Sequence, residues 1–105
     1  MPAAPTLLPD VEQRENTSAR PRVAPRWKVI LLNDDITTFE FVIDMLVRIF
    51  HKNSREAVRL THEVHEKGAA VVEITSLERA ELYVEQVRST ARPSGFPLCA
   101  TLEPE

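Results

Sequence analysis

Three consecutive residues with hydrogen-bond acceptors, Asn33, Asp34 and Asp35, directly follow a short apolar run. Adjacent carboxylates repel each other, so such a pair favours a nearby cation. Farther along the chain, His62 and His65 stand three residues apart, a spacing that brings two side chains to the same side of a helix. Binding of a cation is therefore the chemistry that these residue types could perform. A solvated turn that caps the next helix is the alternative without a binding function.

A metal centre is the less favoured interpretation of these residues. The single cysteine, Cys99, excludes a cysteine-based zinc site, and the sequence contains no HExxH motif and no glycine-rich phosphate loop. The spacing of the apolar residues also places His62 and His65 at the two flanks of a buried stripe rather than together. We therefore expect no metal and no other cofactor. A small metal-dependent hydrolase that uses Asp34, Asp35 and His65 remains an open alternative.

Apolar periodicity indicates the elements that must position these side chains. Short runs rich in β-branched residues favour strands, and apolar residues that recur every three or four positions favour helices. We expect, in chain order, a strand over 27–32, a helix over 37–51, a helix over 54–67, a strand over 69–75, a helix over 77–92 and a strand over 98–102.

Capping residues set the expected ends of these helices. Thr37, followed by Glu40 three positions later, is expected to cap the first helix as a capping box. Ser54 and Ser76 are expected to cap the second and third helices. Gly68 is expected to end the second helix, because glycine readily adopts the left-handed conformation of a helix end.

The resulting order, β-α-α-β-α-β, predicts a single α+β domain in which a three-stranded antiparallel-type sheet packs against three helices. We place this domain at residues 26–105. Residues 1–25 contain five of the eight prolines and show no periodicity, so they are expected to form a disordered N-terminal extension.

Composition limits the possible partners. A chain of 105 residues allows one small domain, and a net charge of −3 disfavours a general nucleic-acid surface. No apolar run is long enough to span a bilayer, and the N-terminus has no signal-peptide pattern. One cysteine allows no internal disulfide. We therefore expect an intracellular protein with no nucleic-acid partner and no membrane partner.

The sequence resembles the ClpS family of protease adaptors. Residues 27–35, Trp-Lys-Val-Ile-Leu-Leu-Asn-Asp-Asp, followed by Thr37 and by Phe-Glu-Phe-Val-Ile at 39–43, are similar to the opening of that family. The resemblance continues through Val64, His65 and Gly68 and through 97–103. It therefore covers nearly the whole predicted domain, and the fold known for the family has the same element order.

The resemblance implies an adaptor without a catalytic step. Such adaptors bind N-degrons, which are substrates whose first residue is bulky and hydrophobic, typically Leu, Phe, Tyr or Trp. They deliver these substrates to a ClpA- or ClpC-type AAA+ unfoldase for degradation by ClpP. We expect a monomer when the protein is free, located in the bacterial cytoplasm. A plastid is less favoured because the first 25 residues contain three acidic side chains. An interaction domain like that of the ribosomal stalk, which has a related shape, remains an alternative.

The resemblance also implies roles for individual residues. Asn33, Asp34, Asp35 and His65 would accept hydrogen bonds from the substrate's α-amino group, which is largely cationic at neutral pH. The pocket for the first side chain would be lined by Thr37, Thr38, Phe39, Val42, Thr61, Val64 and Leu98. Glu78 and Tyr83 would face the unfoldase, and the N-terminal extension would engage the unfoldase during delivery.

Four positions depart from the family pattern. Thr38 and Phe39 stand where many members have Pro and Met, and Tyr83 stands where Lys is common. Thr61 occupies a position where many members carry a Met that excludes β-branched first residues. Because Thr is smaller than Met, we expect Ile and Val to be accepted better here than in relatives with Met.

Overall fold

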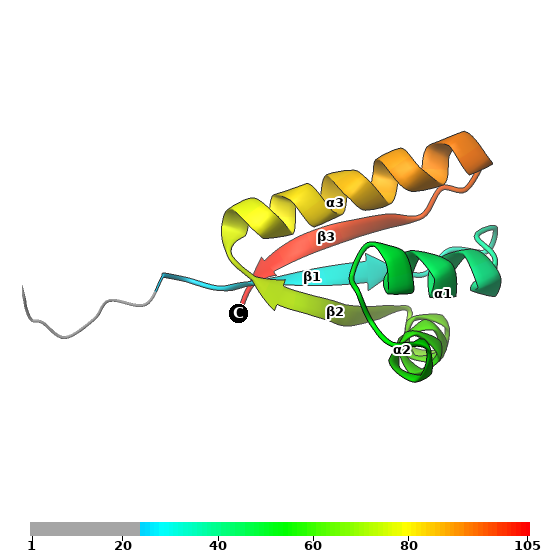
Figure 1. The fold of residues 1–105 in the computed structure, drawn as a ribbon, viewed down its shortest axis with the longest axis horizontal. Helices are drawn as coiled ribbons and strands as arrows, with labels where there is room; N and C mark the ends of the chain where they lie inside the picture. The colour runs from blue at the N-terminus through cyan, green and yellow to red at the C-terminus, as the bar shows by residue number, and fades with distance from the viewer. Residues whose placement is uncertain (1–23) are drawn as a thin grey trace, which may run out of the picture.

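The computed structural model describes residues 24–105, so the predicted extension lies outside the described residues except for its last two positions. The predicted order of elements and the α+β class are confirmed (Figure 1). The elements are β1 (Trp27–Leu32), α1 (Phe39–Arg48), α2 (Ser54–Lys67), β2 (Ala69–Thr75), α3 (Leu77–Ala91), a short 3-10 helix (Arg92–Ser94) and β3 (Cys99–Pro104).

The three strands form an antiparallel sheet with β1 in the centre, in the order β2-β1-β3. Trp27, at the start of β1, pairs with Thr75 on one side and with Pro104 on the other. Just beyond this end, the amide of Glu105 donates to the carbonyl of Arg26 at 2.9 Å, and their side chains form an ion pair at 3.0 Å. Backbone and side-chain contacts therefore join β1 and β3 at the end of the sheet where β1 begins and β3 ends.

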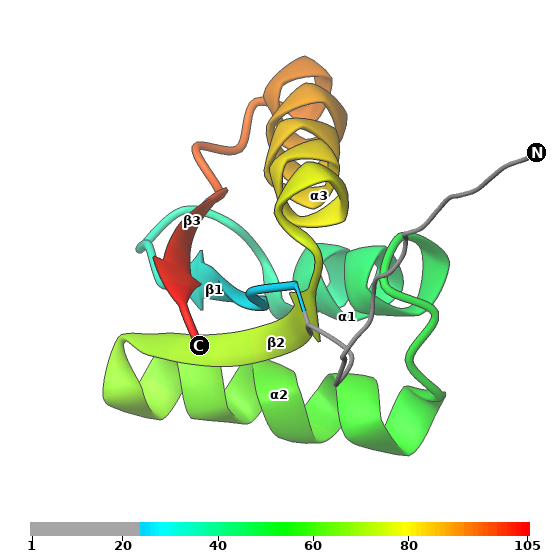
Figure 2. The ribbon, with the colours of Figure 1, turned by 90° about the vertical axis from the view of Figure 1, so that its left-hand side faces the viewer.

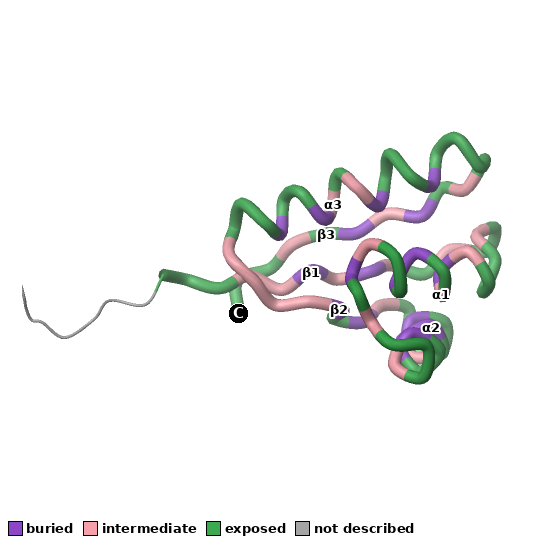
Figure 3. Tube along the Cα trace, viewed as in Figure 1, coloured by how far each residue is buried: buried purple, intermediate pink, exposed green. Residues whose placement is uncertain are grey.

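The helices cover the sheet as the alternation of its side chains requires. Val29 and Leu31 in β1 are fully buried, and the other four residues of the strand are only half-buried (Figure 3). Helix α3 lies along β3 and β1, and α2 runs beneath β2 (Figures 1 and 2). The predicted inward stripe of α2 is confirmed, because all of its members are buried: Ala57, Leu60, Thr61 and Val64.

Two of the predicted N-caps are wrong by one residue. Thr38, not Thr37, caps α1, and its hydroxyl accepts a hydrogen bond from the amide of Phe41 at 3.2 Å. Asn53, not Ser54, caps α2, and its Oδ1 accepts at 2.8 Å. The hydroxyl of Thr37 is instead bonded to the carboxylate of Asp34. Each cap was misplaced because two capping residue types stand side by side, and the type alone does not say which one has the extended backbone.

The ends of α3 and the C-terminal end of α2 agree with the sequence prediction. Helix α1 does not, because it ends at Arg48 and not at His51, whose backbone has a left-handed φ of 59° and so cannot continue the helix. Ser76 caps α3 as expected, with its Oγ accepting from Arg79 N at 3.3 Å. Gly68 ends α2 in the left-handed conformation, with φ of 87°. Pro93 lies in the short 3-10 helix that follows α3. Helix α3 ends at Ala91, within one residue of the expected end at 92, because proline cannot continue it.

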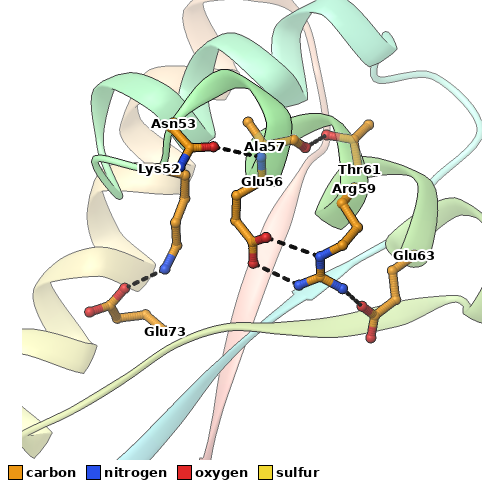
Figure 4. A network of polar contacts seen from close by, with 8 residues as sticks. All are labelled: Lys52, Asn53, Glu56, Ala57, Arg59, Thr61, Glu63 and Glu73. Atoms are coloured by element: carbon orange, nitrogen blue, oxygen red, sulfur yellow. Dashed lines mark hydrogen bonds and ion pairs between the residues drawn. The ribbon is translucent and has the colours of Figure 1, made fainter.

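Ion pairs fix the outward side of α2 and the loop before it (Figure 4). Lys52 reaches across to Glu73 of β2 at 3.1 Å, which ties the loop between α1 and α2 to the sheet. On α2, Arg59 bridges Glu56 at 2.6 Å and Glu63 at 3.1 Å. The Arg59 pairs lie within α2 and support its helical conformation, whereas the Lys52–Glu73 pair joins this region to the sheet. No helix among residues 24–105 is both long and apolar enough to cross a bilayer.

Candidate functional site

A pocket of about 360 Å³ lies at the end of β1, where the chain turns into α1. Its volume is at the lower end of the range for small-ligand pockets, roughly 300–1,000 Å³. The structure brings together in its lining every residue that the sequence pointed to for amine and side-chain binding: Asn33, Asp34, Asp35, Thr37, Thr38, Phe39, Val42, Thr61, Val64, His65 and Leu98. Leu32 and Ile36 also line the pocket and were missed, although both stand next to the acidic turn in the sequence.

Four separate segments supply these residues. The turn after β1 carries the polar groups, the first residues of α1 form the rim, α2 supplies one wall, and Leu98 enters from just before β3. The amide of Asn33 donates to the carbonyl of Gly68 at 2.9 Å, which fixes the acidic turn against the end of α2. The pocket is therefore held by the junctions between elements and not by one flexible loop.

Asp34 organises the turn. Its Oδ1 accepts hydrogen bonds from the amides of Ile36 at 2.8 Å and Thr37 at 2.7 Å, and its Oδ2 accepts from the Thr37 hydroxyl at 2.8 Å. Partial burial raises the pKa of Asp34, but these hydrogen bonds outweigh burial and leave the pKa below its ordinary value. The charge of Arg92 acts in the same direction. Asp34 is thus an ionised carboxylate whose oxygens are already largely engaged.

The other acceptors of the turn are less occupied. Within residues 24–105, no hydrogen bond from a protein donor reaches the side chains of Asn33, Asp35 or His65, and all of them are exposed. A carboxylate and an amide oxygen therefore face the pocket with their acceptor capacity free. A neutral imidazole nitrogen can add one more acceptor. This set suits a cationic group with several N–H donors.

The same residues do not form a metal site. Within the part of the chain that the structure describes, no group of three or more His, Cys, Asp or Glu side chains could hold a metal ion. The geometry therefore gives no support to the hydrolase alternative built from Asp34, Asp35 and His65.

The deep wall of the pocket is apolar. Val42, Val64 and Leu98 are 6%, 4% and 1% exposed, so they border the pocket from within the core. Thr61 is 2% exposed, and its hydroxyl donates to the carbonyl of Ala57 at 2.7 Å. With its donor satisfied by its own helix, Thr61 offers the pocket a short and largely apolar surface.

Arg92 holds the wall that Leu98 provides. Its guanidinium donates to the carbonyl of Leu98 at 2.7 Å and to that of Phe96 at 3.1 Å. The Phe96 ring also packs edge-on against Phe41 of α1, with ring centroids 4.9 Å apart. Arg92 is not among the residues that the sequence predicted at the site. Its position directly before the helix-ending Pro93 is the only indication that the sequence offers.

Aromatic rings form the rim. Phe39, the first residue of α1, is 37% exposed and lies edge-on to His65, with centroids 5.1 Å apart. It lies edge-on to His62 as well, at 5.3 Å. His62 and His65 are both exposed, in agreement with the prediction that they flank the buried stripe of α2.

Glu78 and Tyr83, the two residues expected to face an unfoldase, lie on α3 and not at the pocket. Glu78 is exposed. Tyr83 is only 7% exposed, because its ring stacks on Phe50 with centroids 4.6 Å apart. The guanidinium of Arg79 donates a hydrogen bond to its hydroxyl at 3.3 Å, and both residues line a second surface hollow. Tyr83 therefore offers much less surface than an exposed lysine would.

Comparison with known proteins gives a consistent result. The family model described as "ATP-dependent Clp protease adaptor protein ClpS" matches residues 22–101. The chain is 46% identical over 77 residues to an ATP-dependent Clp protease adapter protein ClpS of Nautilia profundicola. The match covers 73% of this chain and 79% of that protein. It is 48% identical over 85 residues to the protein of the same name from Wolinella succinogenes, which covers 81% and 80%.

A solved structure is similar in fold as well as in sequence. It is that of Agrobacterium tumefaciens ClpS2 bound to L-phenylalaninamide. The match has a TM-score of 0.76 and 35% identity, and it covers 79% of this chain and 100% of the other.

Proposed function

Because the chain belongs to the ClpS family of Clp protease adaptors, and is therefore an adaptor and not an enzyme, we propose that its pocket binds N-degrons. The ligand would be the first residue of a substrate protein, with its free α-amino group and a bulky hydrophobic side chain. One observation carries this proposal: the exposed carboxylate of Asp35 and a buried apolar wall border the same pocket of about 360 Å³.

The polar side of the pocket matches an α-ammonium group. The pKa of such a group is about 7.7–8.0, so at neutral pH it is largely a cation with three donors. Asn33, Asp35 and His65 would accept these donors, since their side chains are exposed and receive no hydrogen bond from within residues 24–105. Asp34 would act mainly by holding the turn and by adding negative charge.

The apolar side of the pocket matches the first side chain. Burial of a large apolar side chain contributes about 1.5–3 kcal/mol, and each charge-assisted hydrogen bond contributes a similar amount. Together they are sufficient for a dissociation constant in the micromolar range. Such a constant corresponds to a net binding free energy of about −8 kcal/mol after the cost of association. The similar Agrobacterium protein was solved with L-phenylalaninamide, which carries both of these features.

The short side chain of Thr61 in the pocket wall supports binding of first residues that are branched at Cβ. Thr61 adds only a short side chain to the wall, and its hydroxyl is bonded to its own helix. A first residue branched at Cβ needs more room close to the backbone than Leu or Phe does. We therefore propose that Ile and Val are accepted alongside Leu, Phe, Tyr and Trp.

Delivery to a Clp unfoldase of the ClpA or ClpC type is the second half of the proposed function. Glu78, exposed at the start of α3, and the region around the Tyr83 hydroxyl are the proposed contacts with the unfoldase. The named relatives are bacterial, and we propose the bacterial cytoplasm as the location.

Fluorescence anisotropy with a labelled Phe-initiated peptide tests the binding half. We expect micromolar affinity for the free N-terminus and a loss of at least tenfold when the α-amine is acetylated, because the acetyl group removes the charge and two donors. A peptide of the same composition with Phe moved to the second position is the control for nonspecific apolar binding. Equal binding of the free and acetylated peptides would contradict the proposal, and so would an absence of binding to any of them.

A further inference from the structure

His62 lies outside the pocket but is connected to it through an aromatic ring. It does not contribute to the pocket lining, whereas Phe39 and His65 both do. The Phe39 ring is edge-on to both imidazoles, with an interplanar angle of 89° to His62 and of 72° to His65. Phe39 is therefore a direct contact through which His62 can act on the pocket.

We propose that His62 is a positioning residue that fixes the Phe39 ring and, through it, the orientation of the His65 imidazole. This inference rests on the proposed function, since it assigns His62 to the amine-binding side of the N-degron pocket. Its effect on binding would be indirect, because the side chain that meets the ligand is that of His65.

The local packing explains why Phe39 needs such a support. It is the first residue of α1 and is 37% exposed, so its ring is not enclosed by the core. The imidazoles of His62 and His65 stand one turn apart on α2 and contact the ring from two positions. Edge-on aromatic contacts of this kind are favourable beyond the area that they bury.

His65 has equally few other restraints. It is exposed, and within the described residues no hydrogen bond holds its ring. Phe39 is therefore the aromatic neighbour that limits the rotation of the His65 imidazole. If the Phe39 ring moved away, His65 would have to be ordered at the moment of ligand binding, and the loss of its rotational freedom would weaken the affinity.

The binding experiment compares substitutions at one exposed position. We expect His62→Ala to weaken the affinity for a Phe-initiated peptide by about two- to tenfold, the range that corresponds to one aromatic contact. His62→Phe, which keeps a ring edge at this position, should stay within about twofold of the unmodified chain. Val58→Ala, one turn earlier on α2 and 39% exposed, is the matched control and should have no effect. Alanine is the best helix former, so a weaker affinity of His62→Ala would not reflect loss of the helix.

A measurement without ligand separates this inference from the proposed function. The ring current of Phe39 should displace the NMR signals of the His65 imidazole, and His62→Ala should shift them while Val58→Ala leaves them in place. Equal signals in both variants, or equal peptide affinity of His62→Ala and the unmodified chain, would overturn the positioning role. An unmodified chain that binds no Phe-initiated peptide would overturn the proposed function instead, and the NMR comparison would still decide whether His62 orders the rim.

Discussion

The two carboxylates that follow β1 are adjacent in the sequence but differ in the hydrogen bonds that they receive. Asp34 receives three hydrogen bonds from its own turn, whereas Asp35 is exposed and receives none within residues 24–105. We expect Asp35→Asn to weaken binding of a Phe-initiated peptide by roughly tenfold or more, the loss of one charge-assisted hydrogen bond. Anisotropy measures this loss, and urea unfolding should show little change in stability. A variant that binds as well as the unmodified chain would exclude Asp35 as an amine acceptor.

Asp34 links the stability of the turn to pH. Because its hydrogen bonds keep its pKa in the folded chain below the ordinary value of 3.8, ionised Asp34 favours the folded state. This contribution is fully present above that value and is lost as the pH falls through the lower pKa of the folded state. The free energy of unfolding of the unmodified chain should therefore exceed that of Asp34→Ala by a constant amount between about pH 7 and pH 5.

The same difference should shrink below about pH 4, as urea unfolding at several pH values would show. Asp35→Ala is the matched control, since its carboxylate receives no such hydrogen bonds, and its effect on stability should be small throughout. A difference for Asp34→Ala that grows toward acid pH would mean that the hydrogen bonds do not hold the carboxylate in its charged form.

Thr61 sets the width of the pocket at its α2 wall. It is almost fully buried and lines the pocket, so a longer side chain at this position must extend into the pocket or disturb the core. We expect Thr61→Met to reduce the affinity for Ile- and Val-initiated peptides more than for Leu- or Phe-initiated ones. Thr61→Val, which keeps the shape and removes the hydroxyl, should preserve the preference of the unmodified chain. An equal loss for all four peptides would show that Thr61 does not select the first residue.

At the residue scale, the resemblance to the ClpS family predicted which residues line the pocket, but not which of them hydrogen-bond to one another. Asp34 and Asp35 carry the same functional group, and only the conformation of the turn decides which carboxylate lies over the amides of Ile36 and Thr37. The coupling of Phe39 to His62 and His65 depends on the approach of two helices, and the pattern of one sequence does not contain it.

The elements themselves depend on caps whose identity can be tested directly. Asn53 caps α2 by accepting the amide of Glu56 at 2.8 Å, while Ser54 is the first helical residue. We expect Asn53→Ala to lower the free energy of unfolding by about 1 kcal/mol. Ser54→Ala should change it by no more than a few tenths, because alanine suits the interior of a helix. Urea denaturation of the pair measures both values, and the reverse ranking would restore Ser54 as the cap.

Periodicity predicted the elements well because each of them buries one face. The alternation in β1 and β3 and the stripe of α2 leave little freedom in strand or helix register. The third helix was predicted less well. Tyr83, expected at a partner surface, stacks on Phe50 in the core, whereas the apolar Leu77 at the start of the helix is 36% exposed. A weakly amphipathic helix allows more than one rotation, and contacts with other elements choose between them.

For the whole molecule, the central position of β1 places the pocket and the C-terminus apart. The strand begins at Trp27, beside the C-terminus, and ends at Leu32, which lines the pocket (Figure 1). Six residues of strand span about 20 Å. The element order predicted three strands but not their arrangement, since nothing in the sequence alone states that β1 lies between β2 and β3. That arrangement is what brings the acidic turn to both α2 and Leu98.

This separation leads to a prediction for residues 1–23, which lie outside the described structure. The contacts that close the sheet begin at Arg26, through its ion pair with Glu105 and the hydrogen bond between their backbones. A chain that starts at residue 24 retains all of them and the complete pocket. We therefore expect it to unfold at the same urea concentration and to bind a Phe-initiated peptide with the same affinity as the full chain, but to deliver an N-degron substrate to the unfoldase more slowly.

A degradation assay with purified unfoldase and peptidase measures delivery, and a chain whose first 23 residues are replaced by a Gly-Ser segment of equal length is the control. Restored delivery by that segment would show that length and flexibility are sufficient. Full delivery by the truncated chain would exclude a role for these residues in the hand-over.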